Sequence, residues 1–220
     1  MVNVSGIYKS YGKNRILAGA SLTAKPGELV ALVGKNGCGK STLLQIMAGT
    51  MKADSGTVSY FGKSDKKIFE KFTGFVPQND PLLEDLSVYD NLRFWAAGKE
   101  TDTEYLKLFE LEDLLKVKVS TLSGGMKRRL SIACSLERKP PVMLMDEPSS
   151  SLDFYYQDSI RSWMLDFKKR NGIIIFSTHN ETEIMISDVV YIFDDGILKR
   201  IEKEDINMDD IRNSFLISDK

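Results

Sequence analysis

The chain has 220 residues, of which 42% are hydrophobic and 28% charged, and this composition is typical of a globular domain. Its length is enough for one α/β domain with its own core. The 30 basic and 31 acidic residues leave a net charge of −1, so no positive excess is present to neutralise a phosphate backbone, and nucleic acid is not an expected partner.

The apolar segments are too short to cross a membrane. The longest runs have the length of strands and fall well below the roughly 18 residues of a membrane-spanning helix. The first residues lack the apolar core of a signal peptide. Cys38 and Cys134 show no metal-type spacing, and no disulfide is expected between them. We therefore expect a soluble protein whose membrane role, if it has one, requires a partner.

Short apolar runs alternate with amphipathic segments, which predicts a mostly parallel sheet flanked by helices. The first clear strand, Val30–Val33, ends at a glycine-rich loop, and the helix Lys40–Ala48 follows with Gly49 beyond its end. Further strands are predicted at Val142–Met145, Ile173–Ser177, Val189–Phe193 and, after an Asp-Asp-Gly turn, Ile197–Lys199.

The segment 79–139 has helical patterns and no convincing strand. Ser87 and Asp90 have the spacing of a capping box and predict a helix that continues through Ala97. Helices are also predicted from Asp102 to Leu115. We interpret 79–139 as a helical lobe inserted into a single domain, 1–220, whose α/β core comprises 1–78 and 140–220.

Two more helices are predicted nearer the end of the sequence. Asp153–Arg170 places apolar residues at the i, i+3, i+4, i+7 positions of one buried face, namely Ile160, Trp163, Met164 and Phe167. The charged tail from Arg200 has apolar residues at helical spacing, Met208, Ile211 and Phe215, and predicts a short docked helix.

The segment Gly34–Thr42 matches the phosphate-binding pattern G-x-x-x-x-G-K-[ST] between a strand and a helix. Glycines let backbone N–H groups turn toward phosphates, and the helix directs its positive end at them. Lys40 adds a point charge, and the Ser41 hydroxyl is suited to Mg²⁺. The predicted nucleotide-binding residues are Gly34, Asn36, Gly37, Cys38, Gly39, Lys40, Ser41 and Thr42.

A second acidic motif, Asp146-Glu147, follows the strand Val142–Met145. Ligands bind at the carboxyl edge of parallel sheets, so these carboxylates are expected beside the phosphate loop. Asp146 is then a candidate to hold Mg²⁺ through water, and Glu147 a candidate general base for the attacking water. An acidic turn after a strand is the alternative reading of the motif by itself.

A third motif, Leu122-Ser123-Gly124-Gly125, precedes a predicted helix and lies between the other two in the sequence. A serine and two glycines at a helix N-terminus form a nest for anions. The alternative is a plain serine-capped helix start. The order of the three motifs carries more information than this one alone.

Taken together, these motifs resemble the ABC transporter ATPase family over nearly the whole chain. Gly34–Thr42 matches its Walker A, Val142–Glu147 its Walker B and Leu122–Gly125 its signature. Gln78 fits the Q-loop glutamine that reaches Mg²⁺ and the nucleophilic water. The remaining matches are the D-loop, Ser150-Ser151-Leu152-Asp153, the switch histidine, His179, and the adenine-stacking aromatic, Tyr11.

The resemblance implies a P-loop NTPase core with antiparallel N-terminal strands, and ATP and Mg²⁺ as cofactors. It also implies catalytic roles for Lys40, Gln78, Glu147 and His179. Taken alone, a single histidine after a strand is usually structural or exposed, and Tyr11 would be an ordinary surface tyrosine.

Two features depart from the family pattern or add to it. Met126 replaces the usual glutamine after the signature, and with Lys127-Arg128-Arg129 it resembles exporters of the ABC-2 kind, which favours export. We expect the basic run to lie on a solvated helix face. Cys38 lies near a helix N-terminus, which predicts an acidified thiol.

By resemblance, two subunits pack head to tail, either as a homodimer or with a paralogous ATPase subunit. Each ATP then lies between the Walker A of one subunit and Ser123–Gly125 of the other, with Asp153 nearby. A transmembrane permease subunit is expected to dock near Asn79–Trp95, where some aromatic residues should stay exposed, and to hold the chain at the cytoplasmic face of the membrane. The alternatives are a soluble ABC ATPase of iron–sulfur cofactor assembly and a non-transport regulatory ABC module.

Overall fold

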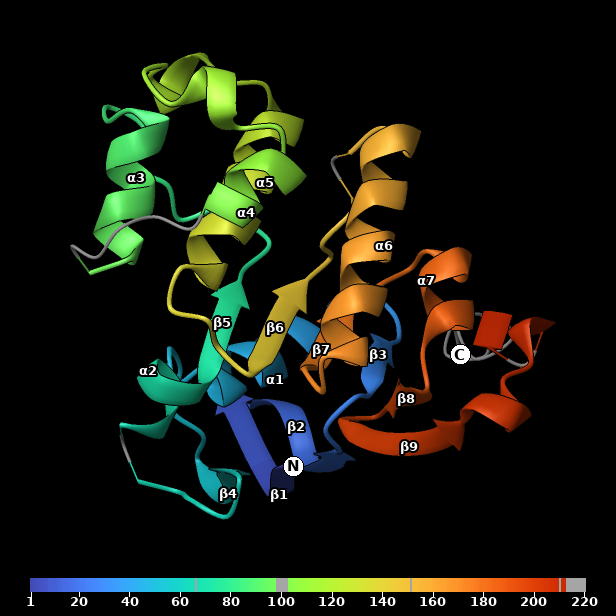
Figure 1. Cartoon of the computed structure of the whole chain (residues 1–220). Helices are drawn as coiled ribbons and strands as arrows, with labels where there is room; N and C mark the ends of the chain where they lie inside the picture. The colour runs from blue at the N-terminus through green and yellow to red at the C-terminus, as the bar shows by residue number, and fades with distance from the viewer. Residues whose placement is uncertain (66, 98–102, 151, 210, 213–220) are drawn as a thin grey trace.

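A computed structural model describes residues 1–65, 67–97, 103–150, 152–209 and 211–212. Its larger sheet has six strands in the order β5-β6-β7-β3-β8-β9 (Figure 1). The first five strands run parallel, and β9 is antiparallel to β8. Their bounds are β3 Leu29–Val33, β5 Thr73–Val76, β6 Val142–Asp146, β7 Ile173–Ser177, β8 Val189–Asp194 and β9 Ile197–Glu202.

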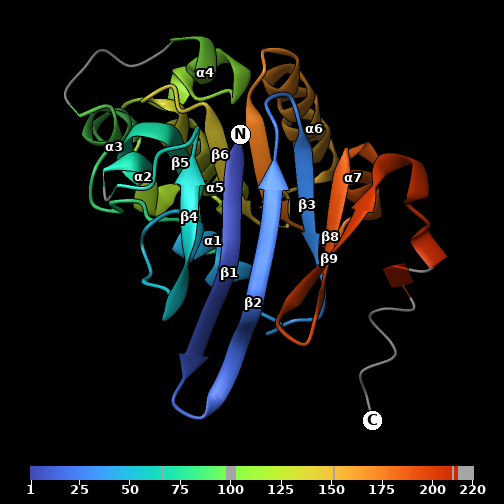
Figure 2. The same cartoon turned by 90° about the horizontal axis from the view of Figure 1, so that it is seen from below.

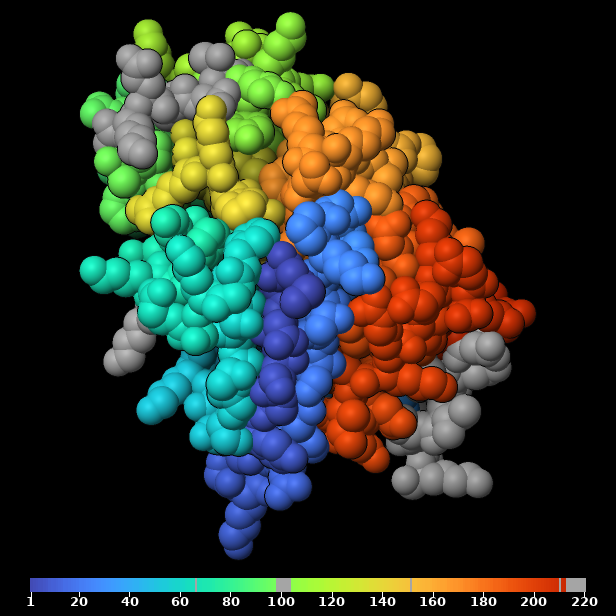
Figure 3. All heavy atoms as spheres, turned by 60° about the horizontal axis from the view of Figure 1, so that its bottom comes forward, coloured from blue at the N-terminus to red at the C-terminus, as the bar shows by residue number. Residues whose placement is uncertain are grey.

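A second, antiparallel sheet of three strands has the order β2-β1-β4. It consists of β1 (Val2–Tyr11), β2 (Asn14–Ala24) and β4 (Ser55–Tyr60). Figure 2 shows β1 and β2 as a long hairpin, and Figure 3 shows this sheet on the surface beside the segment of β8 and β9. The predicted mixture of a mostly parallel sheet and antiparallel N-terminal strands is confirmed.

The strands β3, β6, β7 and β8 are buried on both faces of the sheet, which explains their continuous apolar sequences. Alternate residues of β3 point to opposite sides, so Leu29, Ala31 and Val33 belong to one core cluster and Val30 and Leu32 to the other. The first cluster includes helices α5 (Gly124–Leu136), α6 (Phe154–Lys169) and α7 (Glu181–Ile186). The second includes α1 (Lys40–Met47), α2 (Ile68–Phe72) and the antiparallel sheet.

Helices α1 and α6 begin and end where the sequence predicts. In α6, the Asp153 carboxylate accepts a hydrogen bond from the Tyr156 N–H at 3.2 Å and so caps the first turn. Asn171, just beyond the last turn, adopts a left-handed φ of 62°. Gly49, which follows the end of α1 in the sequence, also has a left-handed φ, of 73°.

The described part of 79–139 contains helices and turns but no strand, and its one isolated bridge joins Ser87 and Lys118. It contains α3 (Val88–Trp95), α4 (Thr103–Leu108), α5 and two short 3-10 turns, Glu112–Leu114 and Val119–Thr121. The predicted cap of α3 is present, because Ser87 Oγ accepts from the Asp90 N–H at 3.1 Å and donates to the Asp90 carboxylate at 2.6 Å. Asp102, where the next helices were predicted to begin, lies outside the described residues.

Of two predictions about charged segments, one is wrong and one is confirmed in part. The basic run is not on a solvated face, because Arg128 and Arg129 are only 2% and 4% exposed. Helix α5 packs against both α3 and β5, which leaves no free face at these positions. The charged tail begins as a strand, because Arg200 belongs to β9. The predicted docked helix is confirmed where it is described, since residues 208–209 and 211–212 are helical and Met208 and Ile211 pack against the core. Phe215 lies outside the described residues.

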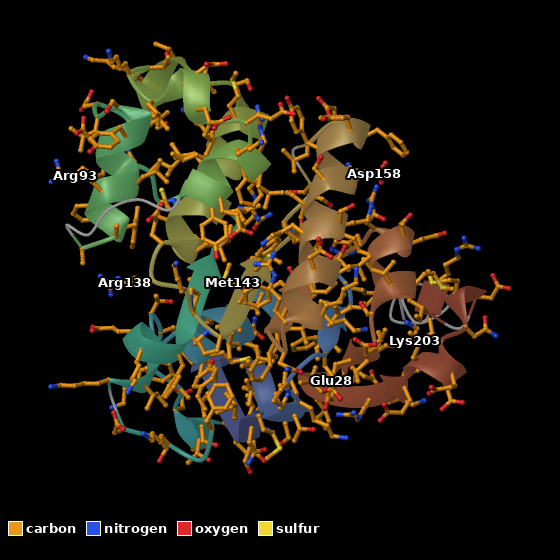
Figure 4. The ribbon with its side chains drawn as sticks, viewed as in Figure 1. Glu28, Arg93, Arg138, Met143, Asp158 and Lys203 are labelled. Carbon is orange, nitrogen blue, oxygen red and sulfur yellow. The ribbon has the colours of Figure 1, made fainter. Side chains whose placement is uncertain are left out.

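The surface and interior divide as the sequence pattern leads one to expect. Met143 on β6 is fully buried, whereas Arg93 on α3 lies at the rim of the molecule (Figure 4). Within the described part of the chain, no helix combines the length and apolarity needed to traverse a membrane. Both cysteines are free thiols.

Candidate functional site

Four neighbouring parallel strands bring the predicted catalytic groups to one edge of the sheet. The strands β5, β6, β7 and β3 are adjacent, and their carboxyl ends lead to Gln78, Glu147, His179 and the Walker A loop respectively. Residues more than 100 positions apart in sequence therefore lie side by side because the register of parallel strands aligns their ends (Figure 1).

These residues line one cavity of about 460 Å³. It brings together most of the predicted site, namely Tyr11, Asn36, Gly37, Gly39, Lys40, Ser41, Thr42, Gln78, Glu147 and His179. Ile16 on β2 also lines it and was not predicted. Ile16 is close to Tyr11 in the sequence, and the hairpin turn between them, whose position the sequence does not predict, brings Ile16 to the cavity.

The Walker A loop is shaped by close packing around Gly39. This residue has a φ of 114°, and a Cβ added there would lie 2.9 Å from Leu17 Cδ2 and 3.0 Å from Ile16 Cγ2. A larger residue would therefore be both strained and crowded at the start of α1. The buried Lys40 ammonium donates to the backbone oxygens of Gly34 at 2.7 Å and Lys35 at 3.0 Å, so it lies within the curve of its own loop.

Glu147 and His179 face each other in the cavity, with 3.3 Å between Oε1 and Nε2. Glu147 has a left-handed backbone, φ 49°, which costs a non-glycine residue on the order of 1–3 kcal/mol unless its surroundings impose it. Ser177 on β7 helps to impose it, because the Glu147 N–H donates to Ser177 Oγ at 2.9 Å and to the Ser177 backbone oxygen at 3.2 Å.

The pKa of His179 is lowered from its ordinary value of 6.5. Burial is the main cause, and the charge of Lys40 adds to it, while the nearby Glu147 carboxylate acts in the opposite direction. The imidazole is therefore neutral at pH 7 and has one N–H to donate and one nitrogen to accept.

Tyr11 is 51% exposed at the end of β1 and forms one wall of the cavity. Its hydroxyl lies 3.1 Å from the sulfur of Met51, and the Lys9 ammonium lies 5.8 Å from the centre of its ring. The ring thus has neighbours at its hydroxyl and near its centre and stays half exposed beside the cavity, an arrangement suited to stacking with a planar group.

Some predicted site residues do not line the cavity. Asp146 is buried behind it, and its carboxylate accepts a hydrogen bond from Ser177 Oγ at 2.5 Å. Gly34 is buried, and Cys38 faces a neighbouring groove. The prediction of an acidified Cys38 is wrong, because burial raises the pKa of its thiol more than Lys40 and backbone hydrogen bonds lower it.

The signature residues also lie outside this cavity. Ser123 and Gly124 are exposed, and Ser123 Oγ accepts from the Met126 N–H at 3.3 Å, which makes it the N-cap of α5. Asp153 is likewise an N-cap, of α6. In a single copy of the chain these groups serve as helix caps and do not reach the cavity that contains Lys40.

The donor set at the cavity fits Mg²⁺ rather than a softer metal. Ser41 and Gln78 line the cavity and offer a hydroxyl and an amide oxygen, and the Asp146 carboxylate lies behind them. Mg²⁺ is usually held by few protein oxygens together with phosphates and water. Among the described residues, no cluster of three or more His, Cys, Asp or Glu side chains could hold a metal alone.

The comparisons with known proteins point to one family. The sequence profile of the family described as ABC transporter matches residues 17–150. The chain is 33% identical to the sulfate/thiosulfate import ATP-binding protein CysA of Mesostigma viride over 98% of this chain and 65% of that protein. It is also 33% identical to the linearmycin resistance ATP-binding protein LnrL of Bacillus subtilis over 89% of this chain and 67% of that protein.

Solved structures match over nearly their whole length. An ATP-binding cassette solved as a dimer in a post-hydrolysis state with ADP and Pi gives a TM-score of 0.85 at 25% identity, covering 92% of this chain and 99% of that chain. An ATP-binding subunit of an ABC transporter gives a TM-score of 0.86 at 24% identity, covering 97% of this chain and 98% of that chain, which supports the fold.

The chain spans between 58% and 67% of the length of the curated relatives it matches. The family profile covers the Walker A loop, the signature and the Walker B strand, and the structure brings the ends of four strands together at one cavity. This chain belongs to the ABC transporter family of ATP-binding proteins.

Proposed function

We propose that this chain binds ATP, hydrolyses it to ADP and phosphate, and couples that reaction to transport through a separate membrane subunit. The observation that carries the proposal is the convergence of Lys40, Glu147, His179 and Gln78 on one cavity from four adjacent strand ends. Tyr11 and Ile16 form an opposite wall of suitable chemistry for the adenine ring.

In the proposed reaction, the Walker A backbone and the Lys40 ammonium hold the phosphates of ATP at the positive end of α1. Mg²⁺, held by Ser41, Gln78 and Asp146, would supply positive charge against the phosphate oxygens. Glu147 accepts the proton of the attacking water, and neutral His179 hydrogen-bonds the reacting phosphate and orients that water. The 3.3 Å contact between Glu147 and His179 supports these paired roles.

We propose that the working unit is a head-to-tail dimer. Ser123 and Gly124 are exposed at the start of α5 and lie outside the cavity of their own chain, as expected for a nest that serves a second copy. The similar cassette solved as a dimer with ADP and Pi supports this arrangement. Asp153 would then contribute to the seam between copies.

The surface of segment 79–95 is our candidate for docking a permease at the cytoplasmic face of the membrane. Leu83, Leu86, Tyr89 and Phe94 are exposed there, with Phe94 at 59%. Relatives named for import and for resistance favour a transporter over a cofactor-assembly ATPase or a regulatory module. Because both kinds match at 33% identity, the Met126 variant does not by itself select export.

Lys40→Ala tests the ATP site directly. Removing a charge-assisted contact that is worth about 1.5–3 kcal/mol should weaken ATP binding by roughly 10- to 100-fold. Equilibrium binding of ATP is measured on the purified chain, with Lys63→Ala, an exposed lysine outside the cavity, as the control. An affinity for ATP that is equal in both variants would contradict the proposal.

A further inference from the structure

Arg128 is the most completely bonded arginine around the site. It lies on α5, five residues after Ser123, and only 2% of it is exposed. A guanidinium group has five N–H bonds. Each of these five has an acceptor here, and four of the acceptors are backbone carbonyl oxygens.

Three of those carbonyls belong to consecutive residues around the proposed base. One terminal nitrogen, Nη2, donates to the Asp146 oxygen and, at 3.0 Å, to the Glu147 oxygen, and Nε donates to the Pro148 oxygen at 3.2 Å. The guanidinium group thus caps the turn that directs the Glu147 side chain into the cavity.

The other terminal nitrogen contacts the Q-loop. Nη1 donates to the Pro77 oxygen at 2.5 Å and to the Asp80 carboxylate at 2.9 Å. Pro77 is the residue before Gln78, which lines the cavity together with Glu147. One rigid planar group therefore links the backbone of both segments that flank the attacking water in the proposed reaction.

The turn at Glu147 needs such support. Its left-handed backbone persists only where neighbours impose it. Ser177 holds the N–H side of Glu147, as described above, and Arg128 and Ser150 bind its carbonyl side. Arg128 alone among these also contacts the Q-loop segment and lies on the helix that begins at the signature.

We propose that Arg128 is a positioning residue. It fixes the position of Glu147 relative to Gln78 and connects both segments to the signature helix α5. The inference rests on the proposed ATPase function and adds a residue to it. Arg128 is not among the residues that line the cavity, so it acts on the rate of hydrolysis and not on ATP affinity.

Arg128→Lys keeps the positive charge. The lysine ammonium has three donors on a flexible stem, so it cannot bind five acceptors in one plane. We expect kcat for ATP hydrolysis to fall by about tenfold or more, with the Kd for ATP changed less than about twofold. The unchanged Kd also shows that the variant is folded.

Arg129→Lys is the matched control, because it alters an equally buried arginine on the same helix. Arg129 donates to the Phe109 oxygen at 2.9 Å and lies 3.8 Å from the centre of the Tyr156 ring, and its partners are in the helical segment and α6. We expect its kcat to stay within about twofold of the unaltered chain, even where its stability falls as much as that of Arg128→Lys.

A double-mutant cycle separates positioning from a general structural role. If Arg128 acts by positioning Glu147 relative to Gln78, its replacement should have little effect on turnover once the Glu147 carboxylate has been removed. In the Glu147→Gln background, Arg128→Lys should therefore reduce residual turnover by less than about threefold. An undiminished tenfold loss in that background would overturn the proposal, as would a single variant with unaltered kcat.

Asp80→Ala provides a milder variant if Arg128→Lys does not fold. Asp80 lies in a loop, and among the five acceptors of Arg128 in the described part of the chain it is the one side chain. Its removal should lower kcat by about threefold, again with little effect in the Glu147→Gln background. No change in kcat would contradict the proposal. Absence of ATP turnover in the unaltered chain would instead overturn the proposed function, and the inference with it.

Discussion

His179 and Glu147 are held at 3.3 Å in a partly buried cavity beside Lys40, and this setting determines the charge of the imidazole. Burial and Lys40 lower the pKa of His179 by more than Glu147 raises it. A neutral imidazole can form hydrogen bonds at this position without adding a charge, so the site should stay competent at pH values somewhat below neutrality.

Since His179 is the sole histidine, its titration can be followed without assignment. NMR of the imidazole should give a pKa below 6.5, and the pKa should rise in Lys40→Ala and fall further in Glu147→Gln. Because the unfolded chain takes up this proton first, stability should decrease as pH falls through 6.5, less so in His179→Gln. A pKa at or above 6.5 would contradict this environment.

At single residues, local motifs could be predicted from the sequence, whereas features set by tertiary packing could not. The spacing of Gly34–Thr42 and of Asp146-Glu147 identifies the site because these motifs are local. Arg128 was expected to be solvated, since only tertiary packing buries a basic run. Ile16 enters the cavity through the pairing of β1 and β2, and Cys38 is less acidic than its place near a helix start suggests because burial outweighs the positive neighbours.

At the scale of elements, caps fix the helices that carry the motifs. Asp153 caps α6 through the Tyr156 N–H, and Ser87 caps α3 through the Asp90 N–H. Both caps could be predicted because they depend on residues within four positions of each other. The four central strands β3, β6, β7 and β8 could be predicted from continuous apolar runs, whereas β4, β5, α2 and α7 are short and lack a strong periodic pattern.

We predict that Asp153→Ala lowers the free energy of unfolding by about 0.5–2 kcal/mol, as Ser87→Ala should, because each removes an N-cap acceptor. Asp153→Ser keeps an acceptor and should retain most of the stability. Urea unfolding monitored by circular dichroism gives these values. If Asp153→Ala were as stable as the unaltered chain, the observed cap would contribute nothing to folding. A loss of turnover in the stable Asp153→Ser variant would support the role proposed at the dimer seam.

At the scale of the whole molecule, the proposed function requires two exposed surfaces to bind partners. Ser123 and Gly124 face outward at the start of α5, and the apolar residues of segment 79–95 are exposed on and before α3. The sequence predicted exposed aromatic residues in this segment, and the exposure of Tyr89 and Phe94 confirms it. The identity of the protein that covers these residues could not be predicted from the residue spacing of one chain, because it depends on the shape of the partner.

We predict that Phe94→Ser reduces co-purification with the membrane subunit while ATP turnover of the isolated chain stays unchanged, because Phe94 is a large exposed apolar residue that does not line the cavity. Ile197→Ser, which removes an exposed apolar residue at the β8–β9 turn, is the control and should leave co-purification intact. Equal recovery of the membrane subunit with both variants would contradict docking on this segment.

The central claim is that Glu147 is the base for hydrolysis of ATP that is shared between two copies. Size-exclusion chromatography of Glu147→Gln with ATP and Mg²⁺, together with its rate of phosphate release, tests it most directly. We predict that Glu147→Gln forms a stable dimer, whereas the unaltered chain returns to monomers as ATP is consumed, and that its turnover is lower by roughly 100-fold or more. Turnover equal to that of the unaltered chain, or a strictly monomeric nucleotide-bound variant, would contradict it.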